Sequence, residues 1–199
     1  MAVAERSPGE AARAIASALE AAGLDHAIGG ALALAVAGVP RGTKDVDVNV
    51  FVTDDEADRI VDVLVGLAMD VDRAAAIARA RRDGMIVARW DGMRIDIFLS
   101  SIPFSADAAR TRIRVEAADG WAGWFLSAEA IAIFKLLFFR GKDIVDLERL
   151  VAVRGADLDH AYVRRWIVDM MGEDDDRVRR WDDLVARFAS PPSAAAPDR

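Results

Sequence analysis

Two aspartates, Asp45 and Asp47, stand one residue apart in the otherwise apolar stretch DVDVNVFV. Side chains of a β-strand alternate between its two faces, so both carboxylates share one face while Val46 and Val48 point to the other. Two like charges on one face repel each other, and burying them unpaired costs free energy. The pattern therefore predicts a strand whose polar face meets either solvent or a cation.

A third carboxylate, Asp96, alternates with apolar residues in MRIDIF. Mg²⁺ takes carboxylate oxygens and keeps several waters, which leaves room for substrate phosphates. If the two strands lie side by side, the three carboxylates converge and could complete a two-metal site for an in-line displacement. The alternative is a solvated face on each strand, where aspartate simply points outward.

A glycine pair, Gly29 and Gly30, follows a short expected strand over Asp25–Ile28 and precedes an Ala- and Leu-rich expected helix that ends near Ala37. Free backbone N–H groups and the helix dipole at such a turn favour phosphate. Glycines at a strand-to-helix turn also serve tight geometry alone, so both roles are open. The order of strand, glycine pair, helix, Asp-x-Asp strand and single-Asp strand is a specific succession of elements.

The helices and strands expected along the sequence indicate an α+β chain, with a mixed sheet flanked by helices and a C-terminal helical bundle. Helices are expected from a Ser7–Glu10 capping box to about residue 22 and from a Thr53–Glu56 capping box to about residue 67. Asp91-Gly92 predicts a hairpin between strands over 85–90 and 93–99. Further helices are expected over 71–82, 105–110, 128–139, 143–153, 159–171 and 174–188, and a β-rich stretch over 112–125.

This reading divides the chain into a core domain over residues 1–126, a helical region over 127–189 and a disordered tail over 190–199. A length of 199 residues suits either one domain or one compact catalytic unit with a small appendage. The formal charge of -7 argues against a general nucleic-acid coat protein. With no cysteine and two histidines, thiolate zinc sites and multi-histidine metal sites are not expected.

The start of the chain shows no secretory signal. The sequence has no apolar run long enough to span a membrane, so we expect a cytoplasmic protein.

These motifs together resemble the signature of the DNA polymerase β-type nucleotidyltransferase superfamily. They are IGG at 28–30, RGTKDVDV at 41–48 and IDI at 95–97. The R-x-T-x-D-h-D form, in which h is hydrophobic, is similar in particular to the AbiE-type and MenT-like toxin nucleotidyltransferases. The later stretch KLLFFRGKDIVDL at 135–147 resembles the lysine and the R-x-K-D-x-x-D-L element of that group. The resemblance covers about residues 24 to 150.

The resemblance implies roles for the three carboxylates and the two glycines. Asp45 and Asp47 would bind two Mg²⁺ ions, and Asp96 would hold the metal next to the acceptor hydroxyl and help take its proton. Gly29 and Gly30 would let the backbone approach the triphosphate. Many members of the superfamily have serine after the first glycine, whereas this chain has Gly30 there.

The resemblance also implies a set of residues that bind the nucleotide. Lys135 would be catalytic, facing the triphosphate or its acceptor. The nucleotide-binding residues would be Arg41, Thr43, Lys44, Arg140, Lys142, Asp143 and Asp146, with the aspartates positioning a cation or the nucleotide. The residues also have plainer explanations. Lys135 could send its ammonium to water along an apolar surface, Lys142 and Asp146 could form an exposed i, i+4 pair, and the turn residues Arg41 and Lys44 could be solvated.

The implied reaction moves a nucleoside monophosphate from an NTP to a hydroxyl acceptor, and pyrophosphate leaves. The acceptor could be RNA such as tRNA in a toxin-like role, a small hydroxylated molecule or a protein side chain, and a toxin would have an antitoxin protein as partner. Arginines at 110, 112 and 114 could steer RNA, and tryptophans at 121 and 124 could stack on a base, or these side chains could serve the protein's own structure. The alternative function is a catalytically inactive relative that binds nucleotide or a partner protein.

Overall fold

A computed structural model describes residues 6–189 of the chain. The tail predicted to be disordered, 190–199, lies outside the described residues. The chain divides into two compact units, the first comprising Met1–Val36 and Pro40–Ser127 and the second Ala37–Val39 and Ala128–Arg199. Within residues 6–189 no helix combines the length and the apolar character that crossing a membrane requires.

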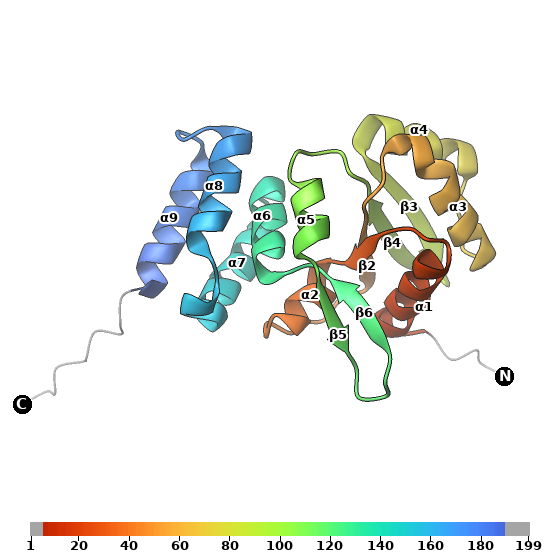
Figure 1. Cartoon of the computed structure of the whole chain (residues 1–199), viewed down its shortest axis with the longest axis horizontal. Coiled ribbons are helices and arrows are strands. Elements are labelled where there is room, and N and C mark those ends of the chain that lie inside the picture. The colour runs from red at the N-terminus through yellow and green to blue at the C-terminus, as the bar shows by residue number, and fades with distance from the viewer. Residues whose placement is uncertain (1–5, 190–199) are drawn as a thin grey trace, which may run out of the picture. The chain divides into compact units, whose positions relative to one another are not determined.

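The first unit is built on a six-stranded mixed sheet with the strand order β3-β4-β2-β1-β6-β5 (Figure 1). The strands are β1 (His26–Ile28), β2 (Asp45–Val50), β3 (Met85–Trp90), β4 (Met93–Phe98), β5 (Ile113–Glu116) and β6 (Ala122–Phe125). The pairs β2–β4 and β1–β6 are parallel. The pairs β1–β2, β3–β4 and β5–β6 are antiparallel. The predicted α+β class with a mixed sheet is therefore confirmed.

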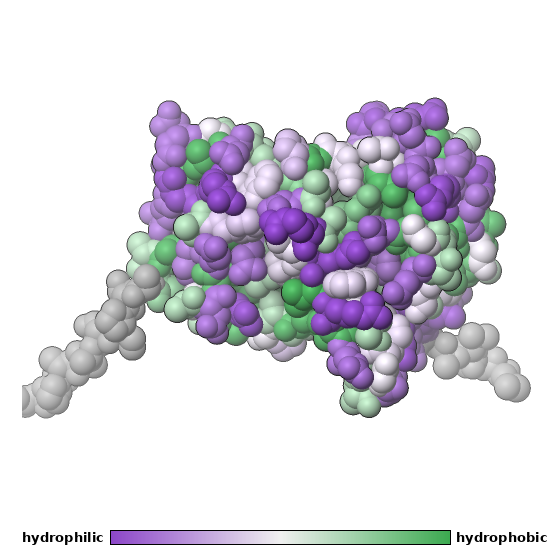
Figure 2. Space-filling view, in the orientation of Figure 1, coloured by the Kyte–Doolittle hydropathy of each residue, from purple (hydrophilic) through white to green (hydrophobic). Residues whose placement is uncertain are grey.

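Helices α1 (Pro8–Ala21), α2 (Gly30–Val36), α3 (Ala57–Gly66), α4 (Arg73–Asp83) and α5 (Ser105–Thr111) accompany this sheet. The predicted capping box of α1 is present, because the Glu10 N–H donates to the Ser7 hydroxyl at 3.2 Å and the Ser7 N–H donates to the Glu10 carboxylate at 2.8 Å. Figure 2 shows hydrophilic side chains gathered over α3 and α4, of which α4 packs against β3 and α3 packs against α4.

The second predicted capping box, Thr53 with Glu56, is wrong. Residues Asp54–Glu56 form a single 3₁₀ turn, the Thr53 side chain makes no capping hydrogen bond, and α3 begins at Ala57. The Glu56 carboxylate instead binds the Arg59 guanidinium one turn on. A charged partner within the helix therefore replaces the backbone N–H that the motif would have satisfied.

The hairpin predicted from Asp91-Gly92 is confirmed, since β3 and β4 pair on either side of it. Asp91 has φ 50° and Gly92 has φ 83°, so both residues take the left-handed conformation that a two-residue hairpin turn requires. The buried faces of β2 and β4 then meet in the core, with Val46 opposite Ile95 and Val48 opposite Ile97. This alternation turns the carboxylates of both strands to the other face of the sheet.

The second unit contains the four predicted helices, α6 (Ala128–Phe138), α7 (Gly141–Arg154), α8 (His160–Met171) and α9 (Asp176–Ala189). A short 3₁₀ turn over Gly155–Asp157 follows α7. The apolar faces of the helices supply nearly inaccessible core side chains, which include Ile131, Leu147, Leu150, Ile167 and Trp181. The Trp181 indole N–H donates to the His160 carbonyl at 3.2 Å, which ties α9 to the start of α8.

Candidate active site

The three carboxylates lie on neighbouring parallel strands, β2 and β4. Asp47 is the direct register partner of Asp96, and Asp45 stands opposite Arg94. Register partners of adjacent strands project to the same face, and adjacent strands lie about 4.8 Å apart. Nothing in the local sequence specifies this pairing, which brings residues from distant parts of the chain together.

Asp47 is held against the turn between β1 and α2. Gly30 has φ +55°, and an added Cβ there would lie 1.9 Å from the Asp47 Oδ2 and 2.7 Å from its Cγ. The Gly29 N–H donates to the Asp47 carbonyl at 2.8 Å. Both the conformation and the contact make a side chain at residue 30 costly, because the turn or the Asp47 carboxylate would have to shift. In this structure a serine at residue 30 would therefore have to displace the Asp47 carboxylate.

Asp45 and Asp96 each have a partner of their own. The Thr43 hydroxyl donates to the Asp45 carboxylate across the start of β2. The Arg94 Nε lies 2.9 Å from Oδ1 and 3.0 Å from Oδ2 of Asp96, whose side chain is only 13% exposed. This hydrogen bond raises the pKa of Arg94 above its ordinary value, and the charges of Asp96, Asp45 and Asp47 add to the effect. Arg94 is thus the counter-ion of the carboxylate face.

Sequence reasoning did not include Arg94 in the site. A signal for it exists, because an R-x-D spacing in a strand puts both side chains on one face. Arg94 also lines an open pocket of about 530 Å³ on the first unit. The complete lining is Arg41, Gly42, Thr43, Lys44, Asp45 and Arg94. Three cationic side chains therefore border a pocket at one edge of the carboxylate face, which suits a polyanionic ligand.

The donor set fits Mg²⁺ in its chemistry. Every candidate ligand is a carboxylate oxygen, and Mg²⁺ sites commonly use one or two carboxylates together with waters and substrate phosphates. The side chains of Asp47 and Asp96 emerge opposite each other, and Gly30 keeps the space beside Asp47 free of a side chain. Within the described range no three carboxylate or histidine groups stand close enough together to form a ready-made metal cluster. The pair, rather than all three, is the preformed part of the site.

A second ionic cluster lies inside the helical unit. The Lys135 ammonium donates to Asp146 Oδ2 at 2.6 Å and to Asp143 Oδ1 at 3.4 Å. The Arg140 Nε donates to Asp143 Oδ2 at 2.6 Å. Lys135 is 7% exposed, so the idea that its ammonium reaches water is wrong. Two buried aspartates of α7 supply the countercharge that makes the burial tolerable.

The carboxylate of Asp143 links this cluster to the start of α7. Burial raises its pKa, but the hydrogen bonds from Arg140 and the charge of Lys135 outweigh that effect, so the pKa lies below its ordinary value. The same carboxylate accepts the Arg140 backbone N–H at 3.2 Å. Asp143 therefore stays ionised and fixes Arg140, while Lys142 is exposed in the first turn of α7.

The comparison with known proteins rests on structure alone. The sequence matches no protein-family model, and no curated protein matches it significantly. The solution structure of the antibiotic-resistance factor ANT(2'')-Ia aligns with a TM-score of 0.51 at 16% identity, covering 88% of this chain and 87% of that chain. The crystal structure of ANT(2'')-Ia with adenylyl-2''-tobramycin aligns with a TM-score of 0.50 at 16% identity, covering 88% and 95%. This chain has a nucleotidyltransferase-like fold.

A nucleotidyltransferase-like protein from Paracoccidioides brasiliensis aligns with a TM-score of 0.47 at 15% identity, covering 87% of this chain and 93% of that chain. At such identities the likeness concerns the fold. The two ANT(2'')-Ia structures, with TM-scores of 0.51 and 0.50, confirm the nucleotidyltransferase-like fold predicted from the motifs, and the toxin branch stays a prediction.

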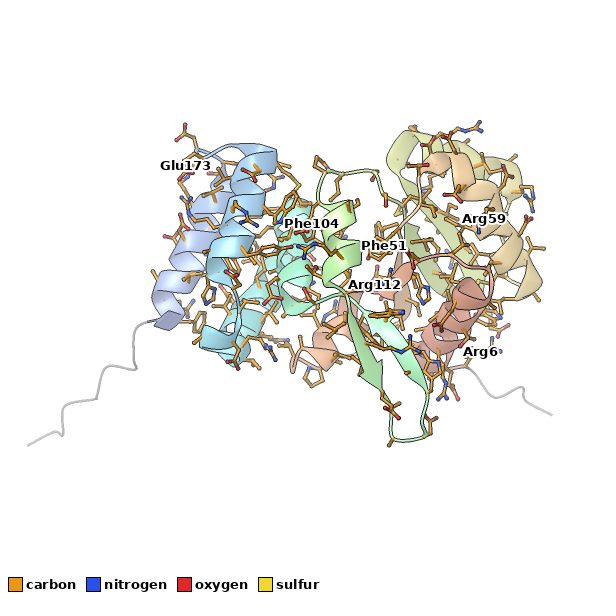
Figure 3. The ribbon with its side chains drawn as sticks, viewed as in Figure 1. Arg6, Phe51, Arg59, Phe104, Arg112 and Glu173 are labelled. Carbon is orange, nitrogen blue, oxygen red and sulfur yellow. The ribbon has the colours of Figure 1, made fainter. Side chains whose placement is uncertain are left out.

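The arginines that could steer RNA are occupied within this nucleotidyltransferase-like fold. Arg112 binds Asp25 at 2.8 Å, and its guanidinium lies 4.7 Å from the ring centre of Trp124 and 5.8 Å from that of Phe51 (Figure 3). Arg114 binds Glu20 at 3.3 Å. Arg112 and Arg114 are thus each paired with a carboxylate of the protein itself.

Proposed function

We propose that the protein is a Mg²⁺-dependent nucleotidyltransferase that moves a nucleoside monophosphate from an NTP to a hydroxyl acceptor. The observation that carries the proposal is the register pair Asp47–Asp96 together with a cationic pocket lined by Asp45 on the same strand and by Arg94, the partner of Asp96. A carboxylate pair and a group of cations on one surface match the two needs of an Mg²⁺–triphosphate complex. The nucleotidyltransferase-like fold supports the same reaction class.

In this proposal Asp45 and Asp47 hold Mg²⁺, and Asp96 holds the metal next to the acceptor hydroxyl. Bound Mg²⁺ would supply Lewis-acid polarisation of the phosphates and neutralise their charge. Asp96, the least exposed of the three, would help take the proton of the acceptor hydroxyl. Gly29 and Gly30 keep the β1–α2 turn close to Asp47, so that its carboxylate is fixed before substrate arrives.

The cations of the pocket would bind the triphosphate. Arg41 and Lys44 supply charge, and Thr43 supplies a hydroxyl that already orients Asp45. Phosphoryl and nucleotidyl transfers need little covalent help from a protein, because positioning and charge neutralisation supply most of the rate. Leaving pyrophosphate would be stabilised by the same cations.

The cluster of the helical unit is proposed as a second phosphate- or acceptor-binding group. Arg140 and Lys142 present cationic groups at the start of α7, and Asp143 orients the first of them. Within this cluster Lys135, together with Asp146, keeps the buried carboxylate of Asp143 in place. This makes Lys135 a positioning residue in the folded protein.

Three acceptor classes stay open. ANT(2'')-Ia was crystallised with adenylyl-2''-tobramycin, a nucleotidylated small molecule, which supports a small hydroxylated acceptor. The resemblance to toxin nucleotidyltransferases supports RNA such as tRNA, and with it an antitoxin protein as partner. A protein side chain is the third class.

The test is transfer of label from each α-³²P-labelled NTP in the presence of Mg²⁺. The purified protein is incubated with total RNA, a protein extract or a small-molecule extract, beside an Asp45→Ala/Asp47→Ala variant. We expect label on one acceptor class with one preferred NTP, and none with the variant. Absence of transfer to every fraction would contradict the proposal.

The second candidate is a noncatalytic protein that binds nucleotide or a partner protein. One observation favours it: both oxygens of Asp96 are engaged by Arg94. Titration calorimetry separates the two candidates, because nucleotide binding without transfer would support the noncatalytic one.

A further inference from the structure

Arg94 belongs to both parts of the proposed site, the carboxylate face and the cationic pocket. Its Nε reaches both oxygens of Asp96, while the residue also lines the pocket that contains Arg41 and Lys44. Its side chain is 46% exposed, in contrast to the 13% of Asp96. The Arg94 side chain therefore borders solvent, whereas the Asp96 side chain is largely enclosed.

We propose that Arg94 is an internal cation that holds Asp96 while no metal is bound, and that it swings into the neighbouring pocket to bind the triphosphate when Mg²⁺–NTP enters. The inference rests on the proposed function and deepens it. It assigns to one side chain two successive partners, a carboxylate and a phosphate.

Asp45, Asp47 and Asp96 put three negative charges on one face of two neighbouring strands, and Arg94 is the cation that meets the least exposed of them. A guanidinium and a divalent cation that bind the same two carboxylate oxygens lie close together and repel each other strongly. Metal binding at Asp96 therefore requires the guanidinium to release at least one of the two carboxylate oxygens.

The pocket supplies the place to which it moves. Arg94 already borders it, so rotation about side-chain bonds is sufficient and the pairing of β4 with β2 and β3 stays intact. A planar guanidinium binds two phosphate oxygens at once, which an ammonium cannot do. The exchange also keeps the charge balanced, since the metal replaces Arg94 at the carboxylate and Arg94 meets the new negative charge of the triphosphate.

The chain offers a matched control in Arg89. It is the register partner of Arg94 on β3, it is exposed, and its guanidinium donates to the Gly92 carbonyl at 3.3 Å. Replacing it removes a strand arginine of the same sheet without removing a partner of Asp96.

The experiment compares wild type, Arg94→Met, Arg94→Lys and Arg89→Met by titration calorimetry. Each protein is titrated with Mg²⁺ alone, and then, at saturating Mg²⁺, with a nonhydrolysable analogue of the NTP. We expect Arg94→Met to bind Mg²⁺ alone about tenfold more tightly and the Mg²⁺–NTP analogue about tenfold more weakly, each step corresponding to about 1.4 kcal/mol. Arg94→Lys keeps a positive charge, so both of its affinities should lie between those of wild type and those of Arg94→Met. Arg89→Met should match wild type.

The opposite signs are the decisive feature. A merely structural arginine would weaken both affinities, and a simple phosphate ligand would change only the second, so either result would overturn the inference. Thermal unfolding monitored by circular dichroism shows whether each variant is folded, and Arg94→Lys carries the test if Arg94→Met does not fold. If wild type binds neither Mg²⁺ nor the analogue, the proposed function fails with the inference. If wild type binds both and the signs are not opposite, only the inference fails.

Discussion

Replacing Gly30 by alanine tests whether the β1–α2 turn fixes Asp47. Gly30 has φ +55°, and its new Cβ would lie 1.9 Å from the Asp47 Oδ2 and 2.9 Å from the Asp47 Cβ. The left-handed conformation costs about 1–2 kcal/mol for alanine. Pushing the carboxylate away adds an overpacking cost of about 1–3 kcal/mol. We expect a total loss of roughly 2–5 kcal/mol in the free energy of unfolding.

The matched control is Gly23→Ala. Gly23 has φ +65°, and no atom lies within 4 Å of its added Cβ, so this variant carries the conformational cost alone. The difference between the two losses, measured by urea unfolding, reports the contact with Asp47. Truncation of Asp47 to alanine in the Gly30→Ala background removes the two nearest atoms, so the double variant should lose less stability than the sum of the single variants.

The same pair of variants tests the site. Because Gly30→Ala displaces the Asp47 carboxylate, we expect its affinity for an Mg²⁺–NTP complex to fall at least about tenfold, or 1.4 kcal/mol. Gly23→Ala should bind as wild type does. The reasoning would be refuted if Gly30→Ala lost no more stability than Gly23→Ala and kept its nucleotide affinity.

Other predictions concern the buried charges. Lys135→Met leaves Asp143 and Asp146 buried without their ammonium, so the free energy of unfolding should fall by about 3–5 kcal/mol, while the exposed control Lys142→Met should leave it nearly unchanged. Equal urea midpoints for the two variants would contradict the buried ion cluster. Burial lowers the pKa of His26 below its ordinary 6.5, so the unfolded state takes up the proton first and stability should decline as pH falls below about 6.5. His26→Gln should remove this part of the pH dependence, measured as unfolding free energy between pH 7 and pH 5, and an unchanged slope would show that another group causes it. The pKa of Asp143 is also lowered, so its contribution should be present above about pH 4 and be lost at more acidic pH, which unfolding of Asp143→Asn against wild type would reveal.

Local signals explain which parts of the fold could be predicted. The Ser7 capping box, the Asp91-Gly92 turn and the alternation around Asp45 and Asp47 each act within a few residues, and each forms as expected. The Thr53 capping box failed because its carboxylate partner has a nearby arginine, a competition that motif spacing does not express.

The geometry of the candidate site depends on contacts between residues that are far apart in the sequence. Asp96 stands opposite Asp47 because β2 and β4 pair in parallel. The sequence alone does not show that these two strands pair, so the convergence of the carboxylates could be predicted only on the assumption that they do. Apolar neighbours around Lys135 were compatible with an ammonium in water or in the core, and the two aspartates of α7 decide for the core. Arg94 was overlooked because its importance arises only where β2 brings Asp45 and Asp47 beside it.

The most direct test of the central claim is the equilibrium binding of a nonhydrolysable NTP analogue with and without Mg²⁺, for wild type and Asp47→Asn. The asparagine keeps the size of the side chain beside Gly30 while removing its charge, and thermal unfolding checks that the fold is kept. We predict that wild type binds the analogue only with Mg²⁺ and that Asp47→Asn loses this Mg²⁺-dependent binding. Equal affinity with and without Mg²⁺, or unchanged binding by Asp47→Asn, would contradict the claim that the β2 and β4 carboxylates hold the metal that holds the nucleotide.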